Sequence, residues 1–412
     1  MAVTGGEDNS YICPTFFVMK PETNVSFEDT AVAFQYKSDA AIKKASFIFS
    51  LVNHPWMSAL ATGSVRLALM LRLPVEGLIR ATAFDHFCGG ENIEETEAAA
   101  ATLARFGVKT ILDYSVEGEK TEAGFDRAME ETLRTIEKAH QSKNIPFSVF
   151  KVTGLASTDV LEKVQKKLIL TPEEHKSFEL VRHRVDNICR LAHAYGVPVL
   201  VDAEETWIQD TVDQLAYEMM EKYNREKAIV FNTYQLYRTT SLQNLKDAYE
   251  SALRHHYFLG AKLVRGAYME KERARATASG HPSPIQPDQA ATDKAFNDAL
   301  VFCVAHRTYI SIMCGSHNEY SNRYLTTLMA EEGMANNDPH VWFAQLYGMS
   351  DNISFNLAKA GYNVAKYVPY GPVRSVMPYL LRRAAENTSV AGQSSRELML
   401  IRSELKRRRN AR

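Results

Sequence analysis

Two adjacent arginines near the end of the chain, Arg382 and Arg383, have the type and spacing best suited to chemistry. Strand-like residues 367–370 and a Gly-Pro turn lead into this segment, whose apolar residues recur at helical spacing. The two sides of the predicted helix are Tyr379, Arg382, Arg383 and Glu386 on one and Met377, Leu380, Leu381 and Ala384 on the other. Paired guanidinium groups beside a tyrosine can hold a small carboxylate. An ordinary surface pair between Arg382 and Glu386 fits the same spacing, so periodicity alone leaves both interpretations open.

Further polar candidates stand at the ends of short apolar runs. The runs begin apolar and end at Asp113, Lys151, Asp202 with Glu204, Gln235, Arg265, His317, Tyr347 and Tyr367. In a parallel barrel the carboxyl ends of all strands surround one mouth. We therefore expect these side chains to converge although they are far apart in sequence.

The elements that must position these residues alternate between strand and helix. The apolar runs occupy residues 109–115, 147–154, 198–205, 228–235, 261–268, 309–317, 341–348 and 363–370. Charged segments long enough for a helix separate them, which predicts an α/β protein with a (β/α)8 TIM-like barrel and an N-terminal helical extension. We expect an arm and helical extension over 1–107, a catalytic barrel over 108–390 and a helical, basic, solvated tail over 391–412. Within the extension, helical spacing occurs over 39–73, 76–87 and 92–106.

Composition narrows the range of partners. The 48 basic and 49 acidic side chains give a net charge of -1, which provides no argument for nucleic acid. The cysteines are scattered, and the amino terminus lacks the basic and apolar regions of a signal peptide. Arg66 and Arg72 interrupt the best membrane-span candidate. These features predict a cytoplasmic protein that acts on a small molecule.

The chemistry of the mouth stays open at this level. Lys151 suits either a Schiff-base nucleophile or the charge partner of a carboxylate. Asp202, Glu204 and His317 could suggest a metal, but no HxH pair occurs at a strand end, so we expect none. There is no GxGxxG after a strand and no Walker A sequence. The residues alone indicate a barrel enzyme for a small carboxylate.

Several motifs together resemble the FAD-dependent proline dehydrogenases, of the monofunctional bacterial type. They are VDAEETW, FNTYQLYR, AKLVRGAYMEKERARA, GSHN, QLYGMSD and YVPYGPVRSVMPYLLRRAAEN, and they agree in content, order and spacing over about residues 107–390. The resemblance implies oxidation of L-proline to Δ1-pyrroline-5-carboxylate in a distorted barrel, with electrons passing through FAD to a quinone. Proline would lie with its C5–H facing the flavin.

The resemblance also implies residue roles. Arg382 and Arg383 match the arginines that clamp the substrate carboxylate, and Glu117 matches a carboxylate that pairs with the first of them and gates the site. The polar residues and enclosing wall of the substrate site match Lys151, Asp202, Tyr268, Leu346, Tyr367 and Tyr379. The family's FAD-contacting positions match Gln235, Lys262, Val264, Arg265, Gly266, Ala267, His317, Asn318 and Glu386.

The chain departs from the family pattern in places. Many bifunctional members have arginine where this chain has Lys262, and the adenine-side segment of those enzymes has no evident counterpart near 285–289. The 412 residues leave no room for their aldehyde dehydrogenase domain, so we expect a separate pyrroline-carboxylate/glutamate-semialdehyde dehydrogenase to take the product. Quinone reduction would fit peripheral contact at the inner face of the membrane. Tyr367 would crowd a 4-hydroxyl group, which predicts preference for proline over hydroxyproline.

Two rival functions remain at this level. One is a barrel Schiff-base lyase that uses Lys151 on a small carboxylate. The other is a non-enzymatic carboxylate-binding protein with the same anion pocket.

Overall fold

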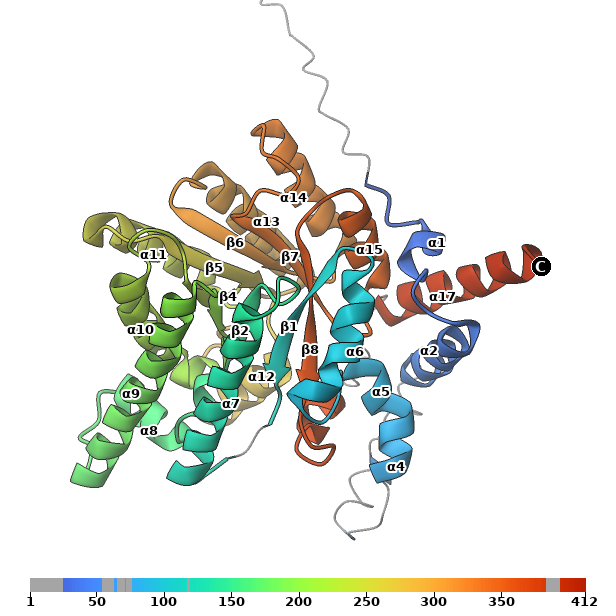
Figure 1. Cartoon of the computed structure of the whole chain (residues 1–412). Coiled ribbons are helices and arrows are strands. Elements are labelled where there is room, and N and C mark those ends of the chain that lie inside the picture. Colours follow the sequence, from blue (N-terminus) through green and yellow to red (C-terminus); the bar gives the residue numbers. More distant parts are fainter. Residues whose placement is uncertain (1–24, 54–62, 65–70, 72–75, 117–118, 383–392) are drawn as a thin grey trace, which may run out of the picture.

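Eight parallel strands close into a barrel in the computed structural model, which describes residues 25–53, 63–64, 71, 76–116, 119–382 and 393–412. Their order around the barrel follows the sequence (Figure 1). The strands are β1 (Val108–Tyr114), β2 (Phe147–Phe150), β3 (Val199–Val201), β4 (Val230–Gln235), β5 (Leu259–Val264), β6 (Ile310–Gly315), β7 (Val341–Leu346) and β8 (Val364–Tyr370). β1 and β8 pair along their whole lengths, from Val108 opposite Val364 to Tyr114 opposite Tyr370, and so close the sheet. The predicted fold class and all eight strand positions are confirmed.

Helices surround the barrel. Those of the barrel part are α7 (Glu122–His140), α8 (Thr158–Gln165), α9 (Pro172–Tyr195), α10 (Thr206–Tyr223), α11 (Ser241–His255), α12 (Met269–Ser279), α13 (Gln289–Ala305), α14 (Glu319–Glu331) and α15 (Asp351–Lys359). A short 3-10 turn, η2 (Val152–Gly154), follows β2. The helices expected between the runs are present, and α8 and α12 are additions that the sequence pattern did not predict.

Local signals explain where the longest helix begins and ends. Thr171 and Glu174 form a reciprocal capping box at the start of α9, and Pro172 occupies its first turn. Gly196 ends the helix in the left-handed conformation, with φ 66°. Such caps satisfy the backbone groups that a helix leaves unpaired at its ends.

The barrel interior is a packed core. Its buried apolar residues include Ile111, Phe147, Val149, Leu200, Phe231, Met313, Ala344, Ala365 and Tyr367. A second, larger cluster lies between the outer face of the strands and the helices, and it includes Ile93 and Leu103 of α6 (Ile93–Ala104). By packing, α6 therefore lies with the barrel, while the boundary at residue 107 remains a prediction.

The N-terminal extension packs with the end of the chain. It consists of α1 (Thr30–Ala33), α2 (Asp39–Val52), α4 (Glu76–Ile79), the π-helical η1 (Arg80–Phe84) and α5 (Asp85–Phe87). These elements share an apolar cluster with residues 373–380 and with α17 (Gln393–Asn410). Within the expected helical segment 39–73, α2 covers residues 39–52, and most of residues 54–75 lie outside the described residues.

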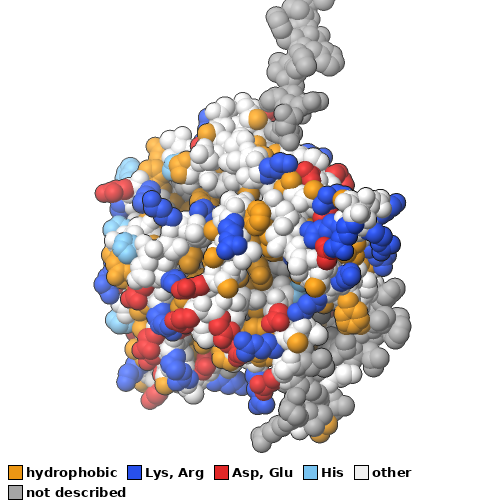
Figure 2. Space-filling view, turned by 45° about the vertical axis from the view of Figure 1, so that its right-hand side comes forward, with side chains coloured by type: hydrophobic (Ala, Val, Ile, Leu, Met, Phe, Trp, Pro, Cys, Tyr) orange, Lys and Arg blue, Asp and Glu red, His pale blue; other side chains and the backbone are white. Residues whose placement is uncertain are grey.

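The last helix is anchored rather than simply solvated. Glu404 is fully buried and binds Arg407 and Arg408, and Arg408 also donates to the carbonyl oxygen of Phe34 at 2.8 Å. Most residues of the basic end are nevertheless exposed, as expected, and lysine and arginine side chains gather on the side of the molecule where α17 lies (Figure 2). The described helices include none with the length and hydropathy required to span a bilayer.

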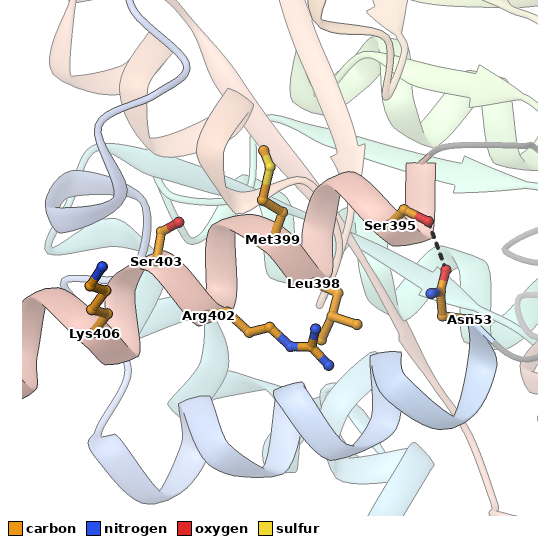
Figure 3. Close-up of a pocket in the computed structure, with 7 residues that line it drawn as sticks. All are labelled: Asn53, Ser395, Leu398, Met399, Arg402, Ser403 and Lys406. Carbon is orange, nitrogen blue, oxygen red and sulfur yellow. Dashed lines mark hydrogen bonds between the residues drawn. The ribbon is translucent and has the colours of Figure 1, made fainter.

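A groove of about 390 Å³ lies along α17, next to Asn53 at the end of α2 (Figure 3). It is lined by Asn53, Ser395, Leu398, Met399, Arg402, Ser403 and Lys406. Ser395 closes one end by donating to the Asn53 side-chain oxygen at 2.9 Å. The groove contains none of the predicted site residues.

Candidate active site at the barrel mouth

A carboxylate held between two lysines lies at the carboxyl ends of the strands. Lys151, which follows β2, donates to Asp202 Oδ2 at 3.1 Å, and Lys262 of β5 donates to Asp202 Oδ1 at 2.5 Å. Asp202 directly follows β3, so the carboxyl ends of β2, β3 and β5 bring these residues together. Lys151 also lies 3.9 Å from Asp113 at the end of β1, and Asp113 accepts a hydrogen bond from Ser115 at 2.7 Å. The expected convergence of strand ends is confirmed for this group.

The charges in this group hold Asp202 ionised. Burial would raise the pKa of Asp202, but the positive charges of Lys262 and Lys151 outweigh it and keep the pKa below the ordinary value of 3.8. Because both carboxylate oxygens already accept a hydrogen bond from a lysine, Asp202 is a poor proton acceptor. Its chemistry is electrostatic.

Tyr367 covers one side of the group. The Lys262 ammonium lies 4.5 Å from the centroid of the Tyr367 ring, a cation–π contact. The Tyr367 hydroxyl is buried and has no hydrogen-bond partner among the described residues. Burial, reinforced by Asp202 and Asp113, raises the pKa of Tyr367 well above 10.0, so the hydroxyl stays protonated and can donate.

Tyr268 lies within electrostatic range of Glu204, Lys151 and Arg382. Burial raises the pKa of Tyr268, with Glu204 adding to the effect, whereas the charges of Lys151 and Arg382 both oppose it. Arg382 is half-buried at the end of helical residues 377–382. The structure therefore brings one arginine of the predicted clamp toward the mouth.

The two-sided helix expected around the arginines needs correction at Tyr379. This residue is only 5% exposed and joins the same apolar cluster as Met377 and Leu380, rather than the polar side. The predicted residues Arg383, Glu386 and Glu117 lie outside the described residues, as does the alternative Arg382–Glu386 pair.

Gln235 links two loops of the mouth. Its side-chain nitrogen donates to the Glu204 carbonyl oxygen at 2.6 Å, and its side-chain oxygen accepts from the Ala267 amide at 3.4 Å. The Glu204 carboxylate accepts a hydrogen bond from the Thr153 amide at 2.9 Å. Burial raises the pKa of Glu204 to about 7, against the effect of the Thr153 hydrogen bonds. These contacts hold the loops after β2, β3, β4 and β5 in register.

The backbone after β5 is open to the mouth. Gly266 and Ala267 are exposed, and Gly266 has a φ of 134°. A Cβ at Gly266 would lie 2.3 Å from the Tyr237 ring, so only glycine fits. At Gly315 of β6, a Cβ would lie 3.0 Å from Val264 Cγ1. At both positions the missing side chain lets neighbouring protein atoms pack against the backbone.

His317 and Asn318 follow β6 at the start of α14. Leu346 N donates to His317 Nε2 at 3.5 Å, and His317 Nδ1 lies 2.9 Å from Ser350 Oγ. This pattern assigns the proton to Nδ1. Asn318 caps α14 by accepting from the Ser321 amide at 3.0 Å.

Two predicted residues are placed differently from the rest. The Arg265 guanidinium donates to Asp293 at 2.7 Å, to Ser316 at 2.8 Å and to Ser321 at 2.9 Å, and stacks on Phe296. It is therefore held by α13, α14 and the loop before α14. Tyr347 packs against the apolar cluster outside the barrel, so it does not converge with the other strand ends as expected.

The arrangement suits a cofactor that contains phosphate groups. The exposed Gly266–Ala267 backbone offers close approach, the Lys262 ammonium offers positive charge, and the 13-residue helix α14 directs its N-terminal amides and dipole toward any phosphate at its start. The described residues contain no group of three or more His, Cys, Asp or Glu side chains arranged to hold a metal ion.

Asp113 was expected to converge with the other strand ends, but it was not assigned a role in the substrate or cofactor site. Its contact with Lys151 makes it part of the charged group, and the signal was available, because Asp113 is itself a polar strand end. Glu272 of α12 was also missed; it lies in a uniformly charged segment where nothing in the pattern distinguishes it.

Comparison with known proteins adds independent information. The proline dehydrogenase family model matches residues 96–396. The chain is 37% identical over 322 residues to the carbapenem antibiotics biosynthesis protein CarD of Pectobacterium carotovorum subsp. carotovorum, covering 78% of this chain and 83% of that protein. It is 35% identical over 384 residues to the mitochondrial proline dehydrogenase 1 of Dictyostelium discoideum, covering 82% of this chain and 67% of that protein.

Solved structures agree on the fold. Proline utilization A (PutA) from Bdellovibrio bacteriovorus, inactivated by N-propargylglycine, is similar with a TM-score of 0.67 at 19% sequence identity. The match covers 89% of this chain and 37% of that chain, so this chain spans less than half of that larger protein. Because the family match extends over most of the chain, including every strand of the barrel, this protein belongs to the proline dehydrogenase family.

Proposed function

We propose that this protein oxidises L-proline to Δ1-pyrroline-5-carboxylate, with FAD as its cofactor and a quinone as the final electron acceptor. The observation that carries the proposal is the ionised Asp202 held between Lys151 and Lys262 beneath the Tyr367 ring, at the mouth of a barrel of this family. Proline has few polar groups, so its recognition requires a rigid charged group and side chains that enclose the ring.

The carboxylate end of proline is bound by Arg382 and Arg383. Arg382 acts on the same space as Lys151 and Tyr268, which supports a substrate position between the arginines and the lysine. Tyr268, Leu346, Tyr367 and Tyr379 enclose the ring and exclude water, and Glu117 gates the site. During oxidation C5 loses a hydride and the nitrogen loses a proton, so that the C–N bond becomes double.

FAD, when bound, supplies the hydride acceptor. The residues proposed to hold it are Gln235, Lys262, Val264, Arg265, Gly266, Ala267, His317, Asn318 and Glu386. Arg265 acts by fixing the start of α14, because its guanidinium group donates hydrogen bonds to Ser316 and Ser321. Lys262 acts as a point charge where other members use a guanidinium group.

The contacts of Lys151 argue against the rival lyase. A Schiff-base lysine must present an amine to a carbonyl carbon. Lys151 instead donates to Asp202 at 3.1 Å and lies 3.9 Å from Asp113, so its ammonium would have to leave two carboxylates before it could react.

A visible spectrum tests the proposal. We expect the purified protein to be yellow and to bleach on anaerobic addition of L-proline. A colourless protein that borohydride traps with its substrate would instead establish the lyase, and a colourless protein that binds proline without turnover would establish a binding protein. Arg382→Met should raise KM for proline with the flavin retained, whereas Arg374→Met, at an exposed arginine paired with Glu76, provides the matched control.

The electron acceptor needs a separate test. Electrons pass from the reduced protein to a quinone, and the product goes to a separate pyrroline-carboxylate/glutamate-semialdehyde dehydrogenase. We place the protein in the cytoplasm, with peripheral contact at the inner face of the membrane. Stopped-flow reoxidation by a water-soluble quinone should be much faster than reoxidation by oxygen, and co-flotation with vesicles should increase when reduced quinone-loaded membranes are used.

A further inference from the structure

Helix α12 (Met269–Ser279) directly follows the mouth residues Gly266, Ala267 and Tyr268, yet it has almost no apolar anchor. Its buried residues are Glu272 and Ala276 alone among the described residues of the helix. A helix of 11 residues is marginal without tertiary contacts. Polar contacts must therefore determine where α12 lies.

Glu272 makes the buried contact. Its side chain is 2% exposed, and its two carboxylate oxygens accept the backbone amide and the hydroxyl group of Thr206, each at 2.6 Å. Thr206 is the first residue of α10, whose own N-cap residue, Glu205, makes no side-chain capping bond. The start of α10 thus receives its cap from α12, where a carboxylate also interacts favourably with the helix dipole.

The other contacts of α12 are more exposed. Lys271 binds Glu205 at 2.6 Å, but its side chain is 66% exposed. Arg275 binds Glu162 at 2.5 Å and lies over the Trp207 ring, with 39% of its side chain exposed. Exposed ion pairs are weak because water screens them, so the Glu272–Thr206 contact is the principal restraint.

This restraint joins two halves of the site. α10 begins four positions after Asp202, and α12 begins immediately after Tyr268. We propose that Glu272 is a positioning residue, whose carboxylate fixes α12 on the start of α10 and thereby holds Tyr268 and the Gly266–Ala267 backbone against the substrate and flavin sites. The substrate part of this inference rests on the proposed function.

Hydrogen exchange of the full-length protein, as purified, tests the restraint directly. In Glu272→Ala, we expect the amides of 266–279 to exchange roughly tenfold faster than in the wild type, with the barrel strands unchanged. We also expect KM for proline to rise roughly tenfold with a smaller change in kcat. Glu272→Gln keeps one acceptor for the Thr206 amide and should restore part of both effects.

Matched variants separate positioning from general damage. Glu270→Ala changes an exposed carboxylate on the same helix and should leave exchange and kinetics at wild-type values. Thr206→Val removes only the hydroxyl partner and should reproduce the Glu272→Ala pattern at smaller size. Should Glu272→Ala fail to accumulate, Thr206→Val decides alone.

Contrary outcomes are well defined. The inference is overturned if the amides of 266–279 exchange at the wild-type rate in Glu272→Ala or, where that variant does not accumulate, in Thr206→Val. It is also overturned if exchange rises equally over the barrel strands. If the wild-type protein is not reduced by proline, the proposed function fails, while the exchange comparison still decides whether Glu272 holds α12.

Discussion

Asp202 and Asp351 are both held by two lysines, but they occupy opposite kinds of environment. Asp202 binds Lys151 at 3.1 Å and Lys262 at 2.5 Å. Asp351 binds Lys37 at 2.8 Å and Lys366 at 2.9 Å. Asp202 lies at the mouth, where its side chain is 14% exposed and that of Lys151 is 21% exposed. The side chains of Asp351 and Lys366 are both 0% exposed. The same three charges thus form one group open to a ligand and one sealed inside the protein.

The remaining partners of Asp351 explain its role. Tyr36 donates to Asp351 at 2.8 Å, and Lys366 donates to the main-chain oxygens of Leu346, at 3.3 Å, and Met349. The group therefore joins the N-terminal extension, β8, α15 and the loop after β7. Burial would raise the pKa of Asp351, but Lys366 and Lys37 outweigh it and hold the pKa well below 3.8. The difference teaches that a buried carboxylate between lysines marks a site only where a ligand can reach it.

Asp351→Asn should cause the largest change, and it should be a change in stability. Removing one member of a buried charged group leaves the others uncompensated, at a cost of about 3–5 kcal/mol in the free energy of unfolding. Urea denaturation measures this. Asp298→Asn, in an exposed pair with Lys294, should cost no more than about 0.5 kcal/mol. Equal losses in the two variants would contradict a structural role for the buried group.

Asp202→Asn should show the reverse pattern. We expect kcat/KM for proline to fall on the order of 100- to 1,000-fold, because a preorganised charge is lost from the mouth. Stability should change less than in Asp351→Asn, since Lys151 can reach water. Steady-state kinetics and urea denaturation of both variants make the comparison, with Asp210→Asn, at an exposed side chain of α10, as the control. If Asp202→Asn lost stability but not activity, the two groups would have the same role.

Glu397 extends the sealed group and makes it sensitive to pH. Burial, with Asp351 adding to it, raises the pKa of Glu397 from 4.5 to about 7, while Lys37 and Lys366 oppose the shift. Between these values the folded protein keeps a proton that the unfolded chain has lost, so stability falls as the pH rises through this window. The total contribution is at most roughly 3 kcal/mol.

Glu397→Gln tests the sign of this effect. The amide oxygen can still accept from the Ser350 amide, which binds Glu397 at 3.0 Å, but the titration is gone. The variant should therefore lose less stability than the wild type between pH 5 and pH 8, as measured by urea denaturation at each pH. Parallel curves for the two proteins would show that Glu397 does not titrate in this range.

The open group was largely predictable from sequence, and the sealed group was not. Lys151 and Asp202 each end an apolar run, and the geometry of a parallel barrel brings strand ends together. Lys37 lies in the extension, far from Asp351 in sequence, and no periodic pattern relates them. Lys366 precedes Tyr367, and side-chain alternation along β8 sends the two to opposite faces. That alternation excludes Lys366 from the mouth, but only packing of α15 identifies its partner.

Helix α12 shows a second limit. The hydrophobic period that reveals the other barrel helices is missing, because α12 is held by Glu272 rather than by an apolar face. The start of α10 lacks a local capping signal for a related reason, since its cap comes from another part of the chain. Contacts supplied from a distance leave no local signal at the helix they stabilise.

Tyr367 offers the smallest and most specific test of the open group. Its ring packs on Lys262, and the side chain is only 6% exposed, so it has little room to move when a 4-hydroxyl group projects from the proline ring. We expect the wild type to prefer proline, and Tyr367→Ser to shift the kcat/KM ratio toward 4-hydroxyproline by roughly tenfold. Tyr362→Ser, outside the barrel, should leave the ratio unchanged. An equal ratio in all three proteins would place Tyr367 outside the substrate wall and leave Asp202 and its lysines as the whole of the open site.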